Sequence, residues 1–407
     1  MDAEVAVDDA RAGEDAWPSL QAWAALAVGV LAVTAHSALS IGTSVLMKPI
    51  LAEFGWDRSA WAASMTTRML AMIAVVTWAG QLTDRIGARR VLAAGGLLMG
   101  AGILGMSAIE SWNQLVLVSV VLGAGQACIG SVAASALVLR LFKRRRGVAI
   151  GVLNGGDNLL NSLVPPAAAA GLAAWGWRPT LGGFAVVYLL LGAAILKVLG
   201  DHDVGPEAVR RRVTLRELPW SDQRLWMLIF AYVCTYAWIT SIQIHFHAFQ
   251  TDLGKTPGDA SELLSIQILV GALGAPLFGW LAERTGARAA LLVVLGGLAA
   301  TSVMTWTVTS YQGFVVWAVL HGLVNSGVVA LLALVVHELF DPAQIGRLMG
   351  LTFVFCMAAT MAGNTFSAWV FDTTGSYLPA WRAYTGIMTL ALVPAWMLYR
   401  SSPTVGT

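Results

Sequence analysis

The chain carries an internal repeat, and this repeat limits its architecture more than any other feature. The segment GQLTDRIGARR at residues 80–90 recurs as GWLAERTGARA at residues 279–289. The pattern GVAIG at residues 147–151 recurs as GRLMG at residues 346–350, at the same offset of 199 positions. Two separate matches in one register indicate that the chain is a duplication, with halves of about 200 residues each.

The composition indicates that both halves lie in a membrane. Hydrophobic residues make up 57% of the 407 residues, charged residues only 12%, and the mean hydropathy is +0.71; soluble domains carry about 25% charged residues. A helix needs roughly 20 apolar residues to cross a bilayer, and the alternation typical of a β-barrel is not visible. The sequence predicts twelve spanning helices, near residues 21–46, 59–82, 88–108, 113–141, 147–173, 179–199, 224–249, 260–282, 288–309, 312–338, 346–371 and 381–399.

The repeat and the spans together predict an all-α membrane protein built from two pseudo-symmetric six-helix bundles. The longest polar connection, residues 201–223, lies where the offset requires a boundary between the halves. Pro165, Pro166 and Pro276 are expected to interrupt the fifth and eighth spans. We expect a tail, a bundle, a linker, a second bundle and a second tail at residues 1–20, 21–200, 201–223, 224–400 and 401–407.

The lysine and arginine residues predict the orientation. With the N-terminus in the cytoplasm, 19 of the 25 cations fall on the cytoplasmic side, in agreement with the positive-inside rule. Both termini are therefore expected on the cytoplasmic side of the plasma (inner) membrane. The net charge of +2 is explained by topology and indicates no nucleic acid, and the polar, acidic first 18 residues do not resemble a signal peptide.

A duplicated membrane domain predicts a transporter rather than an enzyme. The sequence contains no G-x-x-x-x-G-K-[ST] nucleotide-binding loop and no paired catalytic motif such as H-E-x-x-H. Neither ATP drive nor enzymatic activity is expected, and neither is a cofactor or a metal. The expected partners are a small molecule and the lipid bilayer, with a monomer as the default state. A non-transporting receptor is an alternative that no feature of the sequence favours.

Several segments resemble a known family. The loop at residues 80–90 resembles the helix 2–3 motif of the major facilitator superfamily, and the weaker copy at residues 279–289 follows the eighth span. EFGWDRS at 53–59, LFKRRRGVAIG at 141–151 and GWR at 176–178 resemble the monocarboxylate-transporter branch, most closely its bacterial members. The resemblance implies alternating access between two bundles that move a small organic anion, often together with a proton.

The chain departs from that branch at the positions that carry its charges. Characterised animal members have an Asp in the eighth span and, four residues later, an Arg before the proline; here these positions are Gly271 and Ala275. The Lys expected on the first span falls near Ile41. The usual carboxylate clamp and proton carrier are therefore missing, and a monocarboxylate substrate is an analogy at the level of the branch.

Arg68 lies near the middle of the second predicted span, where burying an arginine costs roughly 2.5–3.5 kcal/mol on insertion scales. Subtracting the repeat offset from the branch's two charged positions in the eighth span gives Met72 and Val76 in the second span. Arg68 is one turn from Met72 on the same face. We expect Arg68 to face the central cavity and to bind a carboxylate or similar oxyanion. The alternative is an internal ion pair that only fixes helix packing.

Asp157 is the second charge inside a predicted span, about ten residues into the fifth. An isolated buried carboxylate can take up a proton, as a coupling site must, whereas a partner of Arg68 would stay ionised. The neighbouring Asn154, Asn158 and Asn161 offer neutral hydrogen bonds from one helical face.

The remaining candidates lie on spans that line the cavity in the superfamily. A substrate site is expected to include, besides Arg68, the residues His36, Asn154, Asn158, Tyr236, Gln243, His247 and Asn325. Tyr232, Trp238, His245 and His321 also fall on these spans, although a lone histidine there is more often a hydrogen-bonded core residue. Positions i and i+2 of a helix point apart, so His245 and His247 do not form a metal pair on one helical face.

The repeated loop motif is expected to act in gating at the cytoplasmic side rather than in substrate choice. By the resemblance, the Asp84 carboxylate lies near the N-terminus of the eleventh span, at Gly346, across the bundle interface. Gly80 and Gly87 are expected to permit close packing and the turn. The expected gating residues are Gly80, Asp84, Arg85, Gly87, Arg89, Glu283 and Arg284.

These features predict a secondary active transporter of a small organic anion, coupled to a proton at Asp157 and working by alternating access. The alternative is a proton-coupled exporter of drugs or other metabolites, because Asp157 in an apolar cavity serves that function equally well.

Overall fold

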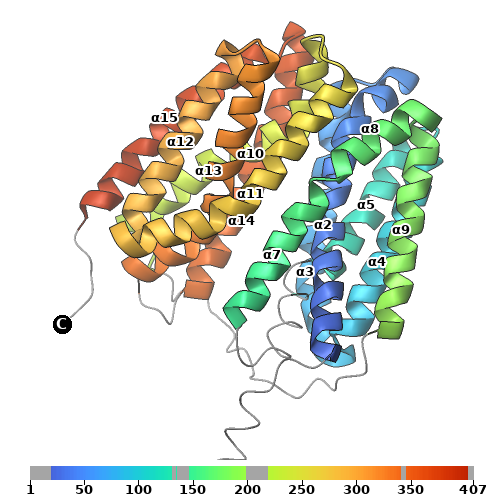
Figure 1. Ribbon diagram of the computed structural model, residues 1–407, viewed down its shortest axis with the longest axis horizontal. Coiled ribbons are helices and arrows are strands. Elements are labelled where there is room, and N and C mark those ends of the chain that lie inside the picture. The colour runs from blue at the N-terminus through green and yellow to red at the C-terminus, as the bar shows by residue number, and fades with distance from the viewer. Residues whose placement is uncertain (1–19, 131–133, 135–145, 199–218, 341–344, 402–407) are drawn as a thin grey trace, which may run out of the picture.

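The computed structural model describes residues 20–130, 134, 146–198, 219–340 and 345–401, and its regular elements are α-helices (Figure 1). Most of the predicted linker and both tails lie outside the described residues. The helices are α2 (Leu20–Phe54), α3 (Arg58–Ile86), α4 (Ala88–Ser107), α5 (Trp112–Ile129), α7 (Arg146–Asn161), α8 (Val164–Trp175), α9 (Trp177–Val198), α10 (Gln223–Asp252), α11 (Pro257–Thr285), α12 (Ala287–Thr307), α13 (Tyr311–Leu339), α14 (Ile345–Thr374) and α15 (Leu378–Arg400).

Ten of the described helices are long and apolar enough to cross a membrane. Helices α7, α8 and α15 are not among these ten; α7 has 16 residues and α8 has 12. The predicted all-α membrane fold is confirmed, whereas the count of twelve spans and the boundaries between the bundles stay predictions.

The prolines act differently in the two halves. Helix α7 ends at Asn161, and α8 begins at Val164, directly before Pro165 and Pro166, because proline lacks the N–H that would continue the helix. Helix α11 instead runs unbroken through Pro276, so the interruption expected there is wrong. A single proline removes one backbone hydrogen bond, which a long membrane helix packed against its neighbours tolerates.

The duplication is visible in the backbone. Helices α3 and α11 both have 29 residues, and their boundaries lie 199 positions apart. Among the described residues, the glycines with positive φ form three pairs at this offset: Gly55 and Gly254, Gly87 and Gly286, and Gly176 and Gly375. Two residues 199 positions apart are called repeat mates below. The two halves therefore follow the same chain path.

The helices form two groups that meet along one seam (Figure 1). Helices α2–α9 pack mainly with one another and are called the N bundle; α10–α15 do the same and are called the C bundle. Across the seam, α2 packs against α10, α3 against α14, and α11 against α7 and α8. The end where α9 ends and α10 begins is called the linker end, and the opposite end is called the latch end.

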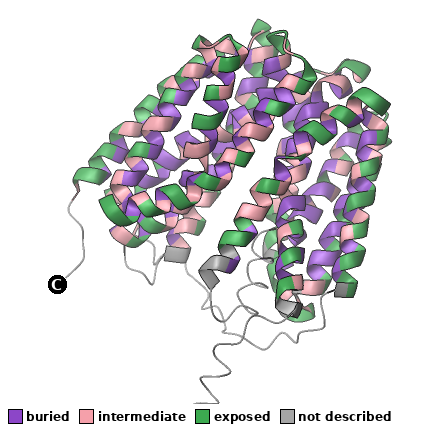
Figure 2. Cartoon of the chain, in the orientation of Figure 1, coloured by how far each residue is buried: buried purple, intermediate pink, exposed green. Residues whose placement is uncertain are grey.

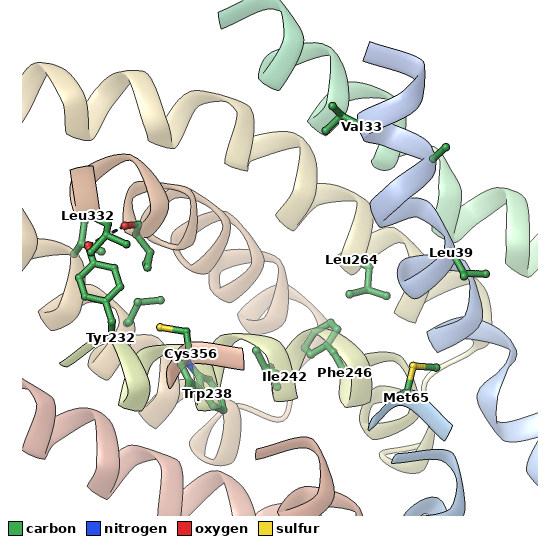
Figure 3. Close-up of a cluster of buried hydrophobic side chains, with 14 of the residues drawn as sticks. Val33, Leu39, Met65, Tyr232, Trp238, Ile242, Phe246, Leu264, Leu332 and Cys356 are labelled. Atoms are coloured by element: carbon green, nitrogen blue, oxygen red, sulfur yellow. Dashed lines mark hydrogen bonds between the residues drawn. The ribbon is translucent and has the colours of Figure 1, made fainter. Parts of the chain in front are cut away.

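Apolar side chains fill the space between helices and also cover their outer faces. Figure 2 shows buried residues on the inward helix faces and exposed residues on the outward faces. In the C bundle, Trp238 packs 5.7 Å from the ring of Trp381, and Ile242 and Phe246 extend this core along α10 (Figure 3). Large apolar residues such as Leu117 are exposed on the outer faces, as expected of helices that contact lipid.

Three glycines, Gly123, Gly274 and Gly322, allow the closest helix crossings, and Gly123 and Gly322 are repeat mates. A Cβ atom at Gly123 would lie 2.1 Å from the carbonyl oxygen of Arg68, and one at Gly322 would lie 2.1 Å from that of Gln267. Small residues let membrane helices approach closely. Since Arg68 and Gln267 are themselves repeat mates, the crossings of α3 with α5 and of α11 with α13 place them at equivalent points.

Candidate substrate site

A cavity of about 110 Å³ lies on the seam between the two bundles. Its walls come from α2 and α7 of the N bundle and from α10, α11 and α13 of the C bundle. Among the described lining residues, Asp157 has the only ionisable side chain, and the other polar groups are amides and hydroxyls. The lining residues are Ser37, Ile41, Asp157, Asn158, Asn161, Gln243, Gln267, Ile268, Gly271, Gly322, Asn325 and Ser326.

Asp157 is held by neutral hydrogen-bond donors. Asn161 Nδ2 donates to Asp157 Oδ1 at 2.6 Å, and Ser37 Oγ donates to the same oxygen at 3.3 Å. Asn161 Nδ2 also donates to Ser37 Oγ at 2.7 Å, which ties α7 to α2. Within the described part of the chain Asp157 forms no ion pair, so no fixed cation holds it in its charged form.

Three amide oxygens of the lining have no hydrogen-bond partner among the described residues: Asn161 Oδ1, Gln267 Oε1 and Asn325 Oδ1. Buried polar atoms are almost always satisfied by protein, water or ligand. An Asn or Gln side chain that turns over exchanges its oxygen for an NH₂ group, so it can present an acceptor or a donor. The cavity can therefore hydrogen-bond a small polar molecule.

Gly271 brings three helices together at the cavity wall. A Cβ atom there would lie 2.7 Å from Ser326 Oγ and 3.7 Å from Asn158 Oδ1. Gly271 is also the position at which the monocarboxylate-transporter branch carries an Asp. Ile41 is the residue near which the Lys of that branch falls. Both line the cavity, so the resemblance locates the cavity although the charges themselves are missing.

Arg68 does not line this cavity. Its side chain is buried, and Nη2 donates to Ser40 Oγ at 3.0 Å and to Met65 Sδ at 2.7 Å. Among the described residues Arg68 forms no ion pair, and it shares no hydrogen-bond partner with Asp157. The structure thus does not show the internal ion pair that the sequence left open. Its acceptor Ser40 does not line the cavity but adjoins the lining residue Ile41, so the guanidinium lies one layer behind the cavity wall.

Asp157, Asn158, Gln243 and Asn325, predicted as site residues, come together in the cavity. Three others, His36, Asn154 and Tyr236, do not line it. His36 Nδ1 lies 3.2 Å from the carbonyl oxygen of Gln126, Asn154 is exposed, and Tyr236 packs 6.1 Å from the ring of Phe353.

The three other histidine candidates, His245, His247 and His321, are hydrogen-bonded inside the C bundle. His245 Nδ1 lies 2.9 Å from the Tyr377 hydroxyl, and His321 Nδ1 lies 3.1 Å from Thr301 Oγ1. Both are core residues, as lone histidines usually are. His247 lies nearer the latch end, with Nε2 3.2 Å from the carbonyl oxygen of Pro257, and does not line the cavity.

Tyr232 and Trp238 also belong to the core rather than the cavity. The Tyr232 hydroxyl donates to the carbonyl oxygen of Val328 at 3.0 Å. The Trp238 side chain is fully buried.

Residues not predicted for the site include Ser37, Gln267 and Ser326. The repeat carries the signal for two of them: Gln267 is the repeat mate of Arg68, and Ser37 is the repeat mate of Tyr236. Ser326 has no such signal, because serine is common in membrane helices and its repeat mate is an alanine.

The first copy of the loop motif lies at the linker end. Gly87 ends α3 with φ 90°, which confirms the expected turn. The close packing expected at Gly80 is not observed: a Cβ atom there meets no described atom within 4 Å, because that side of α3 faces open space. Arg89 donates to the carbonyl oxygen of Leu196, within the N bundle, and Arg85 is exposed. The contact expected between Asp84 and Gly346 lies outside the described side chains.

The second copy forms contacts within the C bundle. Arg288 Nε donates to Glu338 Oε1 at 2.6 Å, and Glu338 Oε2 accepts from the backbone N–H of Ala287 at 2.8 Å, at the start of α12. Glu283 and Arg284 are exposed, with the Arg284 guanidinium over the Trp280 ring. The gating role of both copies stays a prediction.

Charged contacts close the seam at the latch end. Asp252 binds Lys48 Nζ at 2.8 Å and Arg58 Nη2 at 2.7 Å. Asp372 accepts from the backbone N–H of Arg58 at 3.0 Å and from that of Ser59 at 2.7 Å. These five residues, which join the two bundles, are called the latch.

Two bundles that repeat one chain path and enclose a polar cavity on their seam define a multi-pass membrane transporter. The sequence model of the Major Facilitator Superfamily matches residues 27–256 and 228–407, and the chain belongs to this family. The resemblance inferred from the loop motifs is confirmed.

Known proteins resemble the chain over most of its length. It is 23% identical over 353 residues to the uncharacterized MFS-type transporter YcxA of Bacillus subtilis (strain 168), covering 82% of this chain and 84% of that protein. It is 22% identical over 369 residues to monocarboxylate transporter 12 of Rattus norvegicus, covering 80% and 74%. Its fold is similar to that of the nucleoside transporter NupG, with a TM-score of 0.77 at 11% identity over 94% of this chain and 100% of that chain.

Proposed function

We propose that this transporter moves a small organic anion together with a proton by alternating access, with both termini in the cytoplasm and the latch end outside. The observation that carries the proposal is the lining of the seam cavity, where one carboxylate, Asp157, stands among amides and hydroxyls. A group that must bind and release a proton needs such a place, open to the substrate and without a fixed cation.

An anion and an ionised Asp157 repel each other in a cavity this small. When two carboxylates share one site, one of them keeps a proton. An anion therefore binds when Asp157 is protonated, and the carboxyl group then becomes a hydrogen-bond donor to it. Anion binding and proton binding are coupled in this way, and each strengthens the other.

The size and the donors of the cavity suit a small anion. Its volume of about 110 Å³ is well below the roughly 300–1,000 Å³ of pockets for drug-sized ligands. Asn158, Gln243, Gln267 and Asn325 can turn their NH₂ groups toward a carboxylate. Arg68, behind Ser40, adds a positive charge one layer from the wall, which favours an anion at longer range.

The rival function is proton-coupled export of drugs or other metabolites. A cationic substrate would pair with ionised Asp157 and would bind more tightly as the pH rises. An anionic substrate would bind more tightly as the pH falls. The two functions thus predict opposite pH dependence.

Thermal stabilisation of the purified protein by acetate, propionate and benzoate tests the proposal, because a bound ligand stabilises the folded state. The wild type should be stabilised more at mildly acidic than at mildly alkaline pH. Asp157→Asn, which carries a neutral donor at every pH, should be stabilised equally at both. In proteoliposomes this variant should lose accumulation driven by a pH gradient and keep anion exchange.

Glu110→Gln is the matched control, because Glu110 is an exposed carboxylate outside the cavity. It should keep both the pH dependence and the accumulation of the wild type. Stabilisation that grows with pH, or that disappears in Asp157→Asn, would contradict an anionic substrate.

A further inference from the structure

The latch divides its charges by bundle. Lys48 and Arg58 belong to the N bundle, near the end of α2 and at the start of α3. Asp252 and Asp372 belong to the C bundle, at the end of α10 and near the end of α14. If the bundles move as units, opening the latch end separates the two cations from both carboxylates but not from each other.

Comparison of repeat mates explains why Asp252 binds across the seam. Its mate, Glu53, is bound within its own bundle by Arg178 Nη2 at 2.7 Å and by Trp177 Nε1 at 2.6 Å. The mate of Arg178 is Tyr377, which offers Asp252 no positive charge. Asp252 binds the cations of the N bundle instead.

The two latch cations have no equivalents in the C bundle. The repeat mate of Lys48 is His247, and that of Arg58 is Pro257. His247 and Pro257 contact each other rather than the N bundle's carboxylates, with Nε2 3.2 Å from the carbonyl oxygen. The pair of cations that binds a carboxylate is therefore present in the N half of the repeat and not at the equivalent positions of the C half.

Lys48 and Arg58 hold a single carboxylate between them. Asp252 Oδ1 accepts from Lys48, and Asp252 Oδ2 from Arg58. Arg58 is only 7% exposed, and its guanidinium carbon lies 3.3 Å from the Phe371 ring centroid. Its Nη1 has no hydrogen-bond partner among the described residues. A buried guanidinium with an unused donor is suited to the two-pronged geometry of a carboxylate.

Unpaired polar groups continue from the latch toward the central cavity. Gln243 lines the cavity, and His247 and Gln250 follow at i+4 and i+7 on the same face of α10. Gln250 is fully buried, and both polar atoms of its side chain lack a partner in the described part of the chain. The same holds for His247 Nδ1 and for Ser261 Oγ on α11. Unpaired buried groups require water or a ligand, which this strip gains when the latch end opens.

We propose that Lys48 and Arg58 form an outer binding site for the carboxylate of the transported anion, a site that Asp252 occupies while the latch is closed. The proposal rests on the proposed function, because it requires an anionic substrate. When the latch end opens, the anion replaces Asp252 between the two cations and then moves past Gln250 and His247 to the cavity. The anion competes with Asp252 and therefore favours the open latch.

A cysteine reporter at Gln250 tests the outer site. Gln250→Cys is combined with alanine at the three native cysteines, all of which are buried, and is labelled in intact cells with a membrane-impermeant maleimide. Asp252→Asn should raise the labelling rate roughly tenfold, or about 1.4 kcal/mol of latch stability. Because Asp252 no longer competes in this variant, acetate, propionate and benzoate bound between Lys48 and Arg58 should then only cover the cysteine and slow labelling, and the corresponding amides should not. Adding Lys48→Gln or Arg58→Gln should remove the protection by the anions.

Glu53→Gln is the matched control, since Glu53 is the repeat mate of Asp252 and binds within the N bundle; labelling should stay at the wild-type rate. The proposal is overturned if Asp252→Asn leaves labelling unchanged, if the amides protect as well as the anions, or if protection survives without Lys48 and Arg58. If Asp252→Asn does not fold, Lys48→Gln alone should raise labelling several-fold and abolish protection.

Failure of the outer site can be distinguished from failure of the proposed function. Two results together would overturn the outer site alone. Asp157→Asn would abolish proton-driven uptake, whereas Lys48→Gln and Arg58→Gln would leave the KM for uptake from outside unchanged. Protection of the cysteine that depends on Lys48 and Arg58, in a protein without proton-driven uptake, would support the outer site and contradict symport.

Discussion

Arg68 and Gln267 occupy equivalent positions in the two halves of the chain, but their side chains go to different places. Each lies where its helix crosses another helix at a glycine. A Cβ atom added at that glycine would lie 2.1 Å from the carbonyl oxygen of Arg68 or of Gln267. Gln267 lines the cavity, with Oε1 unpaired among the described residues. Arg68 lies one layer behind the wall, although it carries the charge expected to bind substrate.

The neighbours of the two residues account for the difference. Arg68 donates to Ser40 and Met65. The repeat mates of these two acceptors are Ile239 and Leu264, whose side chains accept no hydrogen bond. Gln267 therefore lacks equivalents of the two acceptors that hold Arg68 away from the cavity. The repeat determines where the backbone lies, and the neighbouring side chains determine which way each residue points.

The same asymmetry gives the cavity one charge. Asp157 comes from the N half, and its repeat mate in the C half is the buried Cys356. Most of the amides come from the C half: Gln243, Gln267 and Asn325. Under the proposed function, a single carboxylate carries a single proton in each cycle, whereas a symmetric pair of carboxylates would share one proton between them.

The largest effect is expected where the two halves agree. Gly123→Ala and Gly322→Ala each force a methyl group against a backbone carbonyl oxygen, which should destabilise the protein by about 3 kcal/mol or more. Thermal unfolding in detergent and the amount of folded protein in the membrane measure this. Gly182→Ala and Gly296→Ala, one in each bundle and without a described atom within 4 Å of the new methyl group, should fold normally. Destabilisation by only one of the pair would show that the crossings are not equivalent.

The next largest effect is expected when an arginine is placed in the C half at Gln267, the position equivalent to Arg68. In Gln267→Arg the new guanidinium lacks the two acceptors that hold Arg68, because their repeat mates are Ile239 and Leu264. It should therefore pair with Asp157 across the cavity. Breaking such a buried pair costs roughly 3–5 kcal/mol. Asp157 should therefore stay ionised, and proton-driven accumulation should fall at least about a hundredfold. Uptake into proteoliposomes under a pH gradient measures this.

Gln267→Met is the control for that variant, because it keeps the side-chain length without adding a charge. It should lower the affinity for the anion and keep the dependence of binding on pH. A Gln267→Arg protein that still accumulates anion under a pH gradient would show that Asp157 does not exchange the coupled proton.

A moderate effect is expected when the N half is made like the C half. Arg68→Gln removes a positive charge that acts from behind Ser40, and the affinity for acetate, propionate or benzoate should fall roughly tenfold. Arg68→Lys keeps the charge and should bind nearly as well as the wild type. Complete loss of binding in a folded Arg68→Lys protein would show instead that the guanidinium contacts the anion directly.

The sequence was sufficient for the fold because apolar length and the repeat act on whole helices. It was also sufficient to place Asp157, Asn158, Gln243 and Asn325 at the cavity wall, because polar groups inside a span must face protein rather than lipid. The position of Arg68 was not predictable in this way. Its direction depends on Ser40, on another helix, and a pattern along one helix does not show which acceptor a neighbour supplies.

The latch was not predicted for a different reason. Lys48, Arg58 and Asp252 lie at the ends of spans, where charged residues are common and usually face water. Their pairing depends on how the two bundles dock. The repeat held a partial signal, since Arg178, which binds Glu53, is replaced by Tyr377 in the second half.

The smallest effect is expected for the pair that distinguishes Glu53 from Asp252. The Glu53 and Arg178 side chains are 43% and 36% exposed, so a double-mutant cycle with Glu53→Gln and Arg178→Gln should give a coupling of at most about 1 kcal/mol, and less at high salt. Thermal unfolding at low and high salt measures it. The corresponding cycle for Asp252 and Arg58, whose guanidinium is largely buried, should give a larger coupling that salt reduces less. A stronger pair at Glu53 would reverse the comparison and leave the latch without an energetic advantage over its repeat mate.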